Sequence, residues 1–332
     1  MTSSAAKKSA IRDAQKRDVQ DRIGVASVAI YVCTHERNGP LRRTLDSLVV
    51  AAQQVQPQTE VAVVVVDDNP DGRAAAVVES FDAKCRLARG LHYRHSGSQN
   101  ISTARNLGLD AGIGLADWVA MVDDDQVVAQ EWLSALIEVQ MATGADAVTG
   151  QVELRYPAGS PSWLTDQPFS DILEAEPAPD CAVVSVCSTG NSMLRTSFLV
   201  DNPEIRFRPD LGTFGGEDMV FYREAISAGL DARFAVKAMA WGEQPPHRST
   251  YKHQLRTSYW LGNTEFLTNY ESGDAGRFRL FLRGSRRIAN AVVQPLMKLR
   301  QGEPPHWRFT SAAIARAVGM LVGVIGIKVT HK

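Results

Sequence analysis

Three consecutive aspartates, Asp123, Asp124 and Asp125, follow a short apolar segment at residues 118–122. Crowded carboxylates repel one another, and a hard divalent cation such as Mg²⁺ or Mn²⁺, which prefers oxygen ligands, relieves that repulsion. Asp123 and Asp125 stand at positions i and i+2, so both leave an extended segment on one side and can reach one cation. Mg²⁺ usually takes one or two protein carboxylates and completes its shell with phosphates, so the run predicts a metal–diphosphate site. The alternative is a solvated acidic turn ahead of a helix.

Two further apolar segments end in polar residues. Residues 26–33 lead into the polar segment 34–37, and the Val-rich residues 61–66 lead into Asp67 and Asp68. Ligands of open α/β sheets bind at the carboxyl ends of the strands. Three polar strand ends therefore predict one site at one edge of a sheet. Asp67 itself is interpreted as a turn or capping residue rather than a ligand contact.

Strand and helix patterns alternate through the first 150 residues, which predicts a parallel sheet with helices on both faces. The expected strands are residues 26–33, 61–66, 91–94 and 118–122, and the expected helices are residues 41–52, 74–81, 102–111 and 131–141. Residues 151–179 are rich in loops and contain five prolines. Beyond them we expect strands at 182–186 and 232–236 and a helix at 217–228.

A second acidic pair, Glu217-Asp218, opens the last of these helices, directly after Gly215-Gly216. Glycine lets the backbone approach a ligand closely. The alternative for the acidic pair is ordinary helix capping, since carboxylates are favourable at a helix N-terminus.

The C-terminal third has a different character. Residues 277–300 contain seven basic residues, no acidic one and an interleaved set of apolar residues, a pattern typical of an interfacial membrane helix. The alternative is a helix packed on the rest of the protein with a solvated basic face. Residues 309–327 are apolar apart from Thr310, Ser311 and Arg316, which is marginal for a membrane span, so we expect a peripheral or partly embedded helix.

The bulk composition is that of a globular protein, with 332 residues, 44% hydrophobic and 22% charged residues, and a net charge of −1. Such a charge argues against a nucleic-acid binder. The four cysteines form no C-x-x-C pair and residues 1–24 lack the apolar run of a signal peptide, which favours a cytoplasmic protein. We divide the chain into an arm at 1–24, a catalytic domain at 25–270 (nucleotide half 25–150, acceptor half 151–270) and a membrane-associating helical region at 271–332.

The first 150 residues resemble family-2 glycosyltransferases, enzymes with the GT-A fold. Four segments match in order and spacing: residues 33–37 (CTHER) for the family's C-T-Y-N-R, 64–69 (VVVDDN) for V-V-D-D-x-S, 104–108 (ARNLG) for A-R-N-x-G, and 122–125 (VDDD) for D-x-D-D. The chain departs from the pattern at His35-Glu36, where Tyr-Asn is common. This resemblance implies a Rossmann-like mixed sheet, a nucleotide-sugar donor and a bound Mg²⁺ or Mn²⁺.

The resemblance also implies roles for individual residues. Thr34, Glu36 and Asp68 line the nucleotide pocket, Arg105 holds the pyrophosphate or the base, and Asp123 contacts the ribose or donor sugar. Asp125 coordinates the metal, and Asp124 is the least certain of the three aspartates. Residues 188–195, with Gly190 and Asn191, resemble the segment that closes over the donor sugar. Asp218 is the catalytic base, which Glu217 orients unless it touches the acceptor. Glu243 and His247 stay open as alternatives for a further metal or phosphate contact.

These roles define an inverting transfer of a sugar to a hydroxyl of a glycan or polyprenyl-linked acceptor, on the cytoplasmic face of the membrane. The metal and Arg105 stabilise the leaving diphosphate, and Asp218 deprotonates the acceptor. Two other functions stay open from the residues alone. One is a Mg²⁺-dependent nucleotidyl- or phosphotransferase, although the chain has no Gly-rich phosphate loop. The other is a catalytically silent nucleotide-sugar-binding subunit.

Overall fold

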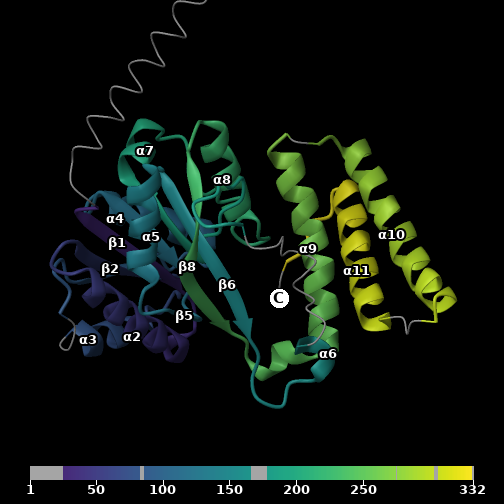
Figure 1. The fold of residues 1–332 in the computed structure, drawn as a ribbon, viewed down its shortest axis with the longest axis horizontal. Helices are drawn as coiled ribbons and strands as arrows, with labels where there is room; N and C mark the ends of the chain where they lie inside the picture. The colour runs from purple at the N-terminus through teal and green to yellow at the C-terminus, as the bar shows by residue number, and fades with distance from the viewer. Residues whose placement is uncertain (1–24, 83–85, 166–177, 274, 303–305, 331–332) are drawn as a thin grey trace, which may run out of the picture.

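The computed structural model describes residues 25–82, 86–165, 178–273, 275–302 and 306–330. The expected N-terminal arm, residues 1–24, lies outside this part of the chain. The described residues form an α/β part and a separate group of three long helices, which stand side by side in Figure 1.

A mixed sheet forms the centre of the α/β part, in the order β3-β2-β1-β4-β7-β6-β8-β5 among the described strands. The strands are β1 (Ser27–Thr34), β2 (Glu60–Asp67), β3 (Leu91–His95), β4 (Trp118–Val122), β5 (Gln126–Val128), β6 (Ala147–Arg155), β7 (Asn191–Arg195) and β8 (Ala232–Glu243). β1 pairs in parallel with both β2 and β4, so the ends of these strands share one edge. β7 runs antiparallel between β4 and β6.

Helices cover both faces of the sheet, as the sequence predicts. One face packs against α2 (Asn38–Val55), α3 (Ala75–Asp82) and α5 (Trp132–Thr143). The other packs against α4 (Ile101–Ile113), α7 (Thr196–Asp201) and α8 (Glu217–Ser227). Strands covered on both sides need apolar residues at every position, which explains the unbroken Val-rich sequence of β2.

The expected strand at residues 182–186 is wrong, because residues 182–186 form no strand and pair with β8 only through an isolated bridge. The segment still lies along β8, where Val184 N donates to Ala232 O at 3.0 Å and Val183 forms an isolated bridge with Arg233. The strands β5, β6 and β7 were not expected from the sequence.

The three long helices are α9 (Tyr251–Glu271), α10 (Arg277–Arg300) and α11 (Trp307–Val324). We call them the three-helix unit. α9 and α11 approach very closely, because Gly262 faces the backbone of Arg316 and Gly319 faces the backbone of Tyr259, each with no room for a Cβ atom. The unit begins at Tyr251, so α9 lies within the residues assigned to the expected catalytic domain, and the division of the chain at 271 stays a prediction. Among the described helices, none is long and apolar enough to cross a membrane.

A partly buried ion cluster joins the three helices. The Glu265 carboxylate on α9 accepts hydrogen bonds from Arg287 of α10 at 2.7 Å and from Arg316 of α11 at 3.0 Å. Burial raises the pKa of Glu265, but the hydrogen bonds and charges of Arg287 and Arg316 outweigh it and hold the pKa below its ordinary value. The cluster fixes the relative position of the helices.

Candidate active site

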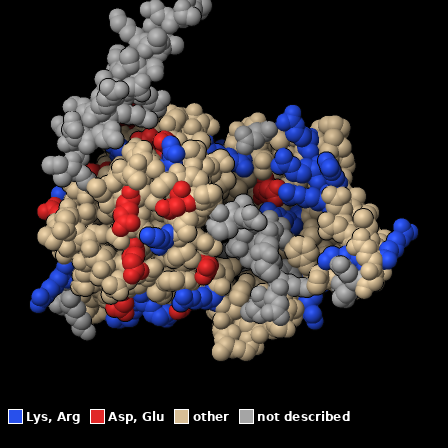
Figure 2. Space-filling view, in the orientation of Figure 1, with Lys and Arg blue, Asp and Glu red and all other residues tan. Residues whose placement is uncertain are grey.

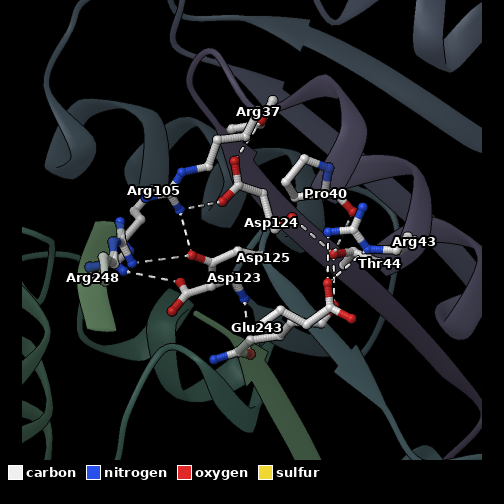
Figure 3. A network of polar contacts seen from close by, with 12 residues as sticks. Arg37, Pro40, Arg43, Thr44, Arg105, Asp123, Asp124, Asp125, Glu243 and Arg248 are labelled. Carbon is white, nitrogen blue, oxygen red and sulfur yellow. Dashed lines mark hydrogen bonds and ion pairs between the residues drawn. The ribbon is translucent and has the colours of Figure 1, made fainter. Parts of the chain in front are cut away.

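The acidic run lies at the carboxyl end of β4, beside the end of β1, and Asp124 anchors it (Figure 3). The buried Asp124 carboxylate accepts hydrogen bonds from Thr34 Oγ1 at 2.7 Å and Arg37 Nη1 at 2.9 Å. Thr44 Oγ1 of α2 donates to Asp124 O at 3.0 Å. Burial raises the Asp124 pKa to about 6, although Arg37 and Thr34 oppose this. The Thr34 hydroxyl and the Asp124 carboxylate thus support each other within the run, and the contacts to the nucleotide donor expected for both residues stay predictions.

Asp125 is held by two arginines. Arg37 Nη1, which also bonds Asp124, donates to Asp125 Oδ2 at 2.8 Å. Arg248 Nη1 lies 3.8 Å from the same oxygen, close enough for an ion pair but not for a hydrogen bond. Asp125, the expected metal ligand, is therefore neutralised from two sides by guanidinium groups.

Arg105 connects the acidic run to the second acidic pair. Its side chain is only 10% exposed, forms an ion pair with Glu217 Oε1 and has Nη2 3.5 Å from Asp123 Oδ1. Burial alone lowers the pKa of Arg105, but Glu217, Asp123 and Asp218 raise it above its ordinary value. Burial raises the pKa of Glu217 despite the opposing charge of Arg105. The guanidinium group thus joins residues that lie about a hundred positions apart in the sequence.

Glu217 and Asp218 form the first turn of α8. The preceding Gly216 has a φ of 87°, which favours glycine, and its α-carbon approaches Thr264 and Thr268 of α9 with no room for a Cβ atom. Glu217 is buried, and its Oε2 atom has no hydrogen-bond partner among the described residues. Asp218 is half-buried and its Oδ1 accepts a hydrogen bond from Met219 N at 2.8 Å. The Glu217 carboxylate is thus buried in an ion pair with Arg105, whereas the Asp218 carboxylate is partly exposed to solvent.

α9 supports the loop before this acidic pair. Trp260 Nε1 donates to Phe214 O at 2.6 Å, and the Trp260 ring leaves no room for a Cβ atom at Gly215, whose φ is 90°. Residues 214–216 are therefore pressed against the three-helix unit, which fixes the start of α8.

Gly190 and Asn191 contribute in different ways. A Cβ atom at Gly190 would lie 2.7 Å from Gln126 Nε2 and 3.1 Å from Asp123 Oδ2, so this glycine permits close packing against the acidic run. The Asn191 amide is fully used inside the protein. Its Nδ2 donates to Gln151 O and Ala238 O, and its Oδ1 accepts from Trp132 Nε1. Asn191 therefore secures β7 through its side chain, and the expected contact with the donor sugar stays a prediction.

The expected nucleotide pocket begins at the end of β2. Asp68 Oδ1 accepts hydrogen bonds from Ser96 Oγ at 2.9 Å, Ser98 N at 3.0 Å and Ser98 Oγ at 2.7 Å, so the carboxylate orders the loop after β3. Asp67 caps the following turn through Asn69 N and Ala74 N, the role expected for it. Glu36 is exposed and lies 3.8 Å from Arg73.

Glu243 and His247, the two alternatives for a further metal or phosphate contact, have other partners in the structure. The Glu243 carboxylate forms an ion pair with Arg43 at 2.7 Å. Its contact with Asp125 is through the backbone, where Glu243 N donates to the carbonyl oxygen of Asp125 at 3.1 Å. His247 packs edge-on against His253. No group of three or more His, Cys, Asp or Glu among the described residues is arranged to hold a metal ion. Asp123 and Asp125 supply hard oxygen donors, which fit Mg²⁺ or Mn²⁺ if phosphates and water complete the shell.

Two functional candidates escaped the sequence interpretation. Arg37 and Arg248 both contact Asp125, although Arg248 lies beyond β8 and more than a hundred residues away in the chain. Arg37 stands just past the end of a strand, in a segment that resembles the family, and this position is the signal that could have found it. Arg248 follows Glu243 and His247, for which the sequence predicts a metal or phosphate contact, but only the fold shows that Arg248 approaches Asp125.

Comparison with known proteins agrees with this geometry. Residues 29–201 match the model of glycosyl transferase family 2. The succinoglycan biosynthesis protein ExoM of Rhizobium meliloti (strain 1021) is 29% identical over 307 residues, which are 91% of this chain and 94% of that protein.

Two solved structures of S. aureus TarS 1–349 share the fold. The complex with UDP-GlcNAc has a TM-score of 0.52 at 19% identity, and covers 71% of this chain and 66% of that one. The complex with UDP has a TM-score of 0.52 at 16% identity, and covers 88% and 89%. The family match spans more than half of the chain, from β1 through the acidic run to α7. The chain accordingly belongs to glycosyl transferase family 2 and is a glycosyltransferase with the GT-A fold, not a nucleotidyl- or phosphotransferase.

Proposed function

We propose that this glycosyltransferase moves a sugar from a nucleotide-diphosphate donor to an acceptor hydroxyl with inversion, and that Asp218 is the base. The observation that supports it best is the bridge formed by Arg105, which pairs with Asp123 on one side and Glu217 on the other. A donor held at the acidic run and an acceptor held at the start of α8 would then meet across one guanidinium group.

The residues divide the reaction between them. A metal ion bound at Asp123 and Asp125 would supply charge stabilisation for the leaving diphosphate. Arg105 keeps Glu217 and Asp123 in place, and its positive charge favours the anion that forms as the bond to the donor breaks. Asp218 accepts the proton of the acceptor hydroxyl while that oxygen attacks the anomeric carbon. One base and one direct displacement give inversion.

The donor and the pathway are proposed from the relatives. TarS structures hold UDP-GlcNAc and UDP, so a uridine diphosphate sugar is the first donor to test. The name of ExoM places that relative in succinoglycan biosynthesis, which supports an acceptor in polysaccharide or cell-envelope synthesis. Thr34, Glu36 and Asp68 stay assigned to the nucleotide side, with Thr34 acting through Asp124.

We also propose a peripheral contact with the cytoplasmic face of a membrane, made by α10. Its surface carries exposed apolar side chains, among them Phe278, Leu282 and Leu296, each more than half exposed. Figure 2 shows Lys and Arg gathered over the three-helix unit. This combination suits a bilayer with anionic headgroups, where a polyprenyl-linked acceptor would reside.

Replacing the base tests the central claim. We expect Asp218→Asn to lower kcat for sugar transfer by about a thousandfold, since general-base catalysis contributes roughly 10²–10⁴. The dissociation constant for UDP with Mn²⁺ should change less than about twofold, because Arg105, Asp123 and Asp125 are intact. The measurements are product formation by mass spectrometry and calorimetric titration with UDP.

The matched control is Asp201→Asn, which removes one carboxylate from an exposed position on α7. This variant should transfer sugar at the wild-type rate. Turnover by Asp218→Asn equal to that of the control would eliminate Asp218 as the base.

A further inference from the structure

The charges at the acidic run do not balance. Five carboxylates face three guanidinium groups, and each of the three arginines already contacts at least one of the carboxylates: Asp123, Asp124, Asp125, Glu217 and Asp218 against Arg37, Arg105 and Arg248. A diphosphate that entered this arrangement alone would meet excess negative charge. A divalent cation that entered alone would meet arginines at the oxygen it needs.

The contested atom is Asp125 Oδ2. Arg37 Nη1 bonds it at 2.8 Å and Arg248 Nη1 lies 3.8 Å away (Figure 3). A cation on this oxygen would stand beside an N–H that points at the same lone pairs, and the two positive charges would repel each other. One of them has to leave the oxygen before the other can bind it well.

Arg37 is the arginine placed to move. Its side chain is 38% exposed, whereas Arg105 is 10% exposed and locked to Glu217. Both bonds of Arg37 to the run use the single atom Nη1, at the tip of a long side chain. A guanidinium group is also well suited to diphosphate oxygens, which it binds through paired N–H donors.

We propose that Arg37 exchanges partners. It neutralises Asp124 and Asp125 in the donor-free protein, and it moves to the diphosphate when a metal–diphosphate complex takes Asp125. This exchange rests on the proposed function, since it requires a metal at Asp125 and a diphosphate donor. Arg37 is then a donor-binding residue that also acts as a competitor of the metal.

The exchange makes metal and diphosphate binding cooperative. The diphosphate draws Arg37 away from Asp125 and so favours the metal, and by thermodynamic reciprocity the metal favours the diphosphate to the same degree. Removing Arg37 therefore has opposite effects on the two ligands: the metal alone binds more tightly, and the diphosphate in the presence of metal binds more weakly. A purely structural arginine would weaken both.

The test measures Mn²⁺ binding by the electron paramagnetic resonance signal of the free ion, with pyrophosphate as a diphosphate that lacks base and sugar. In the wild-type protein we expect pyrophosphate to tighten Mn²⁺ about tenfold, within the usual range of such coupling. The Mn²⁺–pyrophosphate complex in solution enters the fit as a separate equilibrium. In Arg37→Gln we expect Mn²⁺ alone to bind at least about threefold more tightly and the coupling to fall toward one.

Two variants make the result decisive. Arg42→Gln removes the same charge from an exposed position on α2 and should match the wild-type protein in both measurements. Asp125→Asn should abolish the Mn²⁺ signal change, which assigns the measured ion to this site. If Asp125→Asn does not bind Mn²⁺ but Arg37→Gln binds it no more tightly than the wild type, the exchange is overturned and the proposed function stands. Mn²⁺ binding that Asp125→Asn does not alter overturns both the exchange and the metal site.

Discussion

At the scale of single residues, the three aspartates of the acidic run have different surroundings. Asp124 is buried and bonded to Thr34 and Arg37. Asp125 forms ion pairs with two arginines, and Asp123 forms one with Arg105. The sequence predicted that the run and Glu217-Asp218 belong to one site, because both follow patterns that the family shares. It could not predict which aspartate is buried, because that depends on side chains from β1 and α2 that approach only in the fold.

Gly190 offers a prediction at this scale. We expect Gly190→Ala to raise the donor KM several-fold with little change in kcat, because the added methyl group would push the Gln126 amide and the Asp123 carboxylate out of place. Both displaced atoms lie at the tips of side chains that can rotate, so the free energy of unfolding should change by less than about 1 kcal/mol. Steady-state kinetics and urea unfolding measure the two effects.

The control for this substitution is Gly39→Ala, where nothing lies within 4 Å of the added methyl group. It should leave the donor KM unchanged. A Gly190→Ala protein with wild-type KM would show that residues 188–190 lie away from the donor.

At the scale of elements, α9 contacts both the α/β part and the other two long helices. On one side, Trp260 and Thr264 of α9 support residues 214–216. On the other, Glu265 of α9 pairs with Arg287 of α10 and Arg316 of α11. Sequence patterns indicated most elements of the first 150 residues, because strands buried on both faces and helices with one apolar face leave clear signals. They missed β5, β6, β7 and α9, whose burial depends on partners far away in the chain.

The Glu265 cluster predicts a pH dependence of stability. Its carboxyl has a folded-state pKa below the ordinary value of about 4.3, so the cluster contributes its full stability above that pH. The contribution is lost as the pH falls through the lower folded-state pKa. We expect Glu265→Gln to lower the free energy of unfolding by about 3 kcal/mol at pH 7, because Arg287 and Arg316 both lose their ion pair with Glu265.

The difference between wild type and Glu265→Gln should narrow as the pH falls below about 4. Urea unfolding followed by circular dichroism at several pH values measures it, with Glu79→Gln at an exposed position of α3 as the control. A difference that stays constant across this range would contradict the role given to the ion cluster.

At the scale of the whole molecule, the apolar residues of α10 are divided between two sides. Leu280, Gly284 and Ala291 are buried toward α11, whereas positions 278, 282, 289 and 296 lie on the opposite side at helical spacing. Arg279, Arg283 and Arg286 are exposed beside that outer face. The amphipathic character was readable in the sequence, but which face would stay open required knowing where α11 packs.

We expect the protein to bind vesicles that contain phosphatidylglycerol more tightly than neutral vesicles. Replacing Arg279, Arg283 and Arg286 together by Gln should weaken this binding roughly a hundredfold, since each basic residue near an anionic surface contributes about 1 kcal/mol. Leu282→Ser with Leu296→Ser should weaken binding to both kinds of vesicle. Vesicle sedimentation gives the partition coefficients.

Val200→Ser, an exposed apolar position on α7, serves as the control and should bind as the wild type does. Substitution is a cleaner test than truncation after residue 272, which would also uncover the side of α9 that packs against α11. Equal binding by the outer-face variants and the wild type would show that α10 faces something other than a bilayer.

The place of β7 in the sheet has a consequence for how the chain is made. β7 lies between β4 and β6, so the edge of β4 stays open until residues 191–195 have been synthesised. An open edge strand offers unpaired N–H and C=O groups to any other chain. The first 150 residues hold the best-recognised motifs, but we expect them to aggregate when produced alone, since both halves of the chain contribute strands to one sheet.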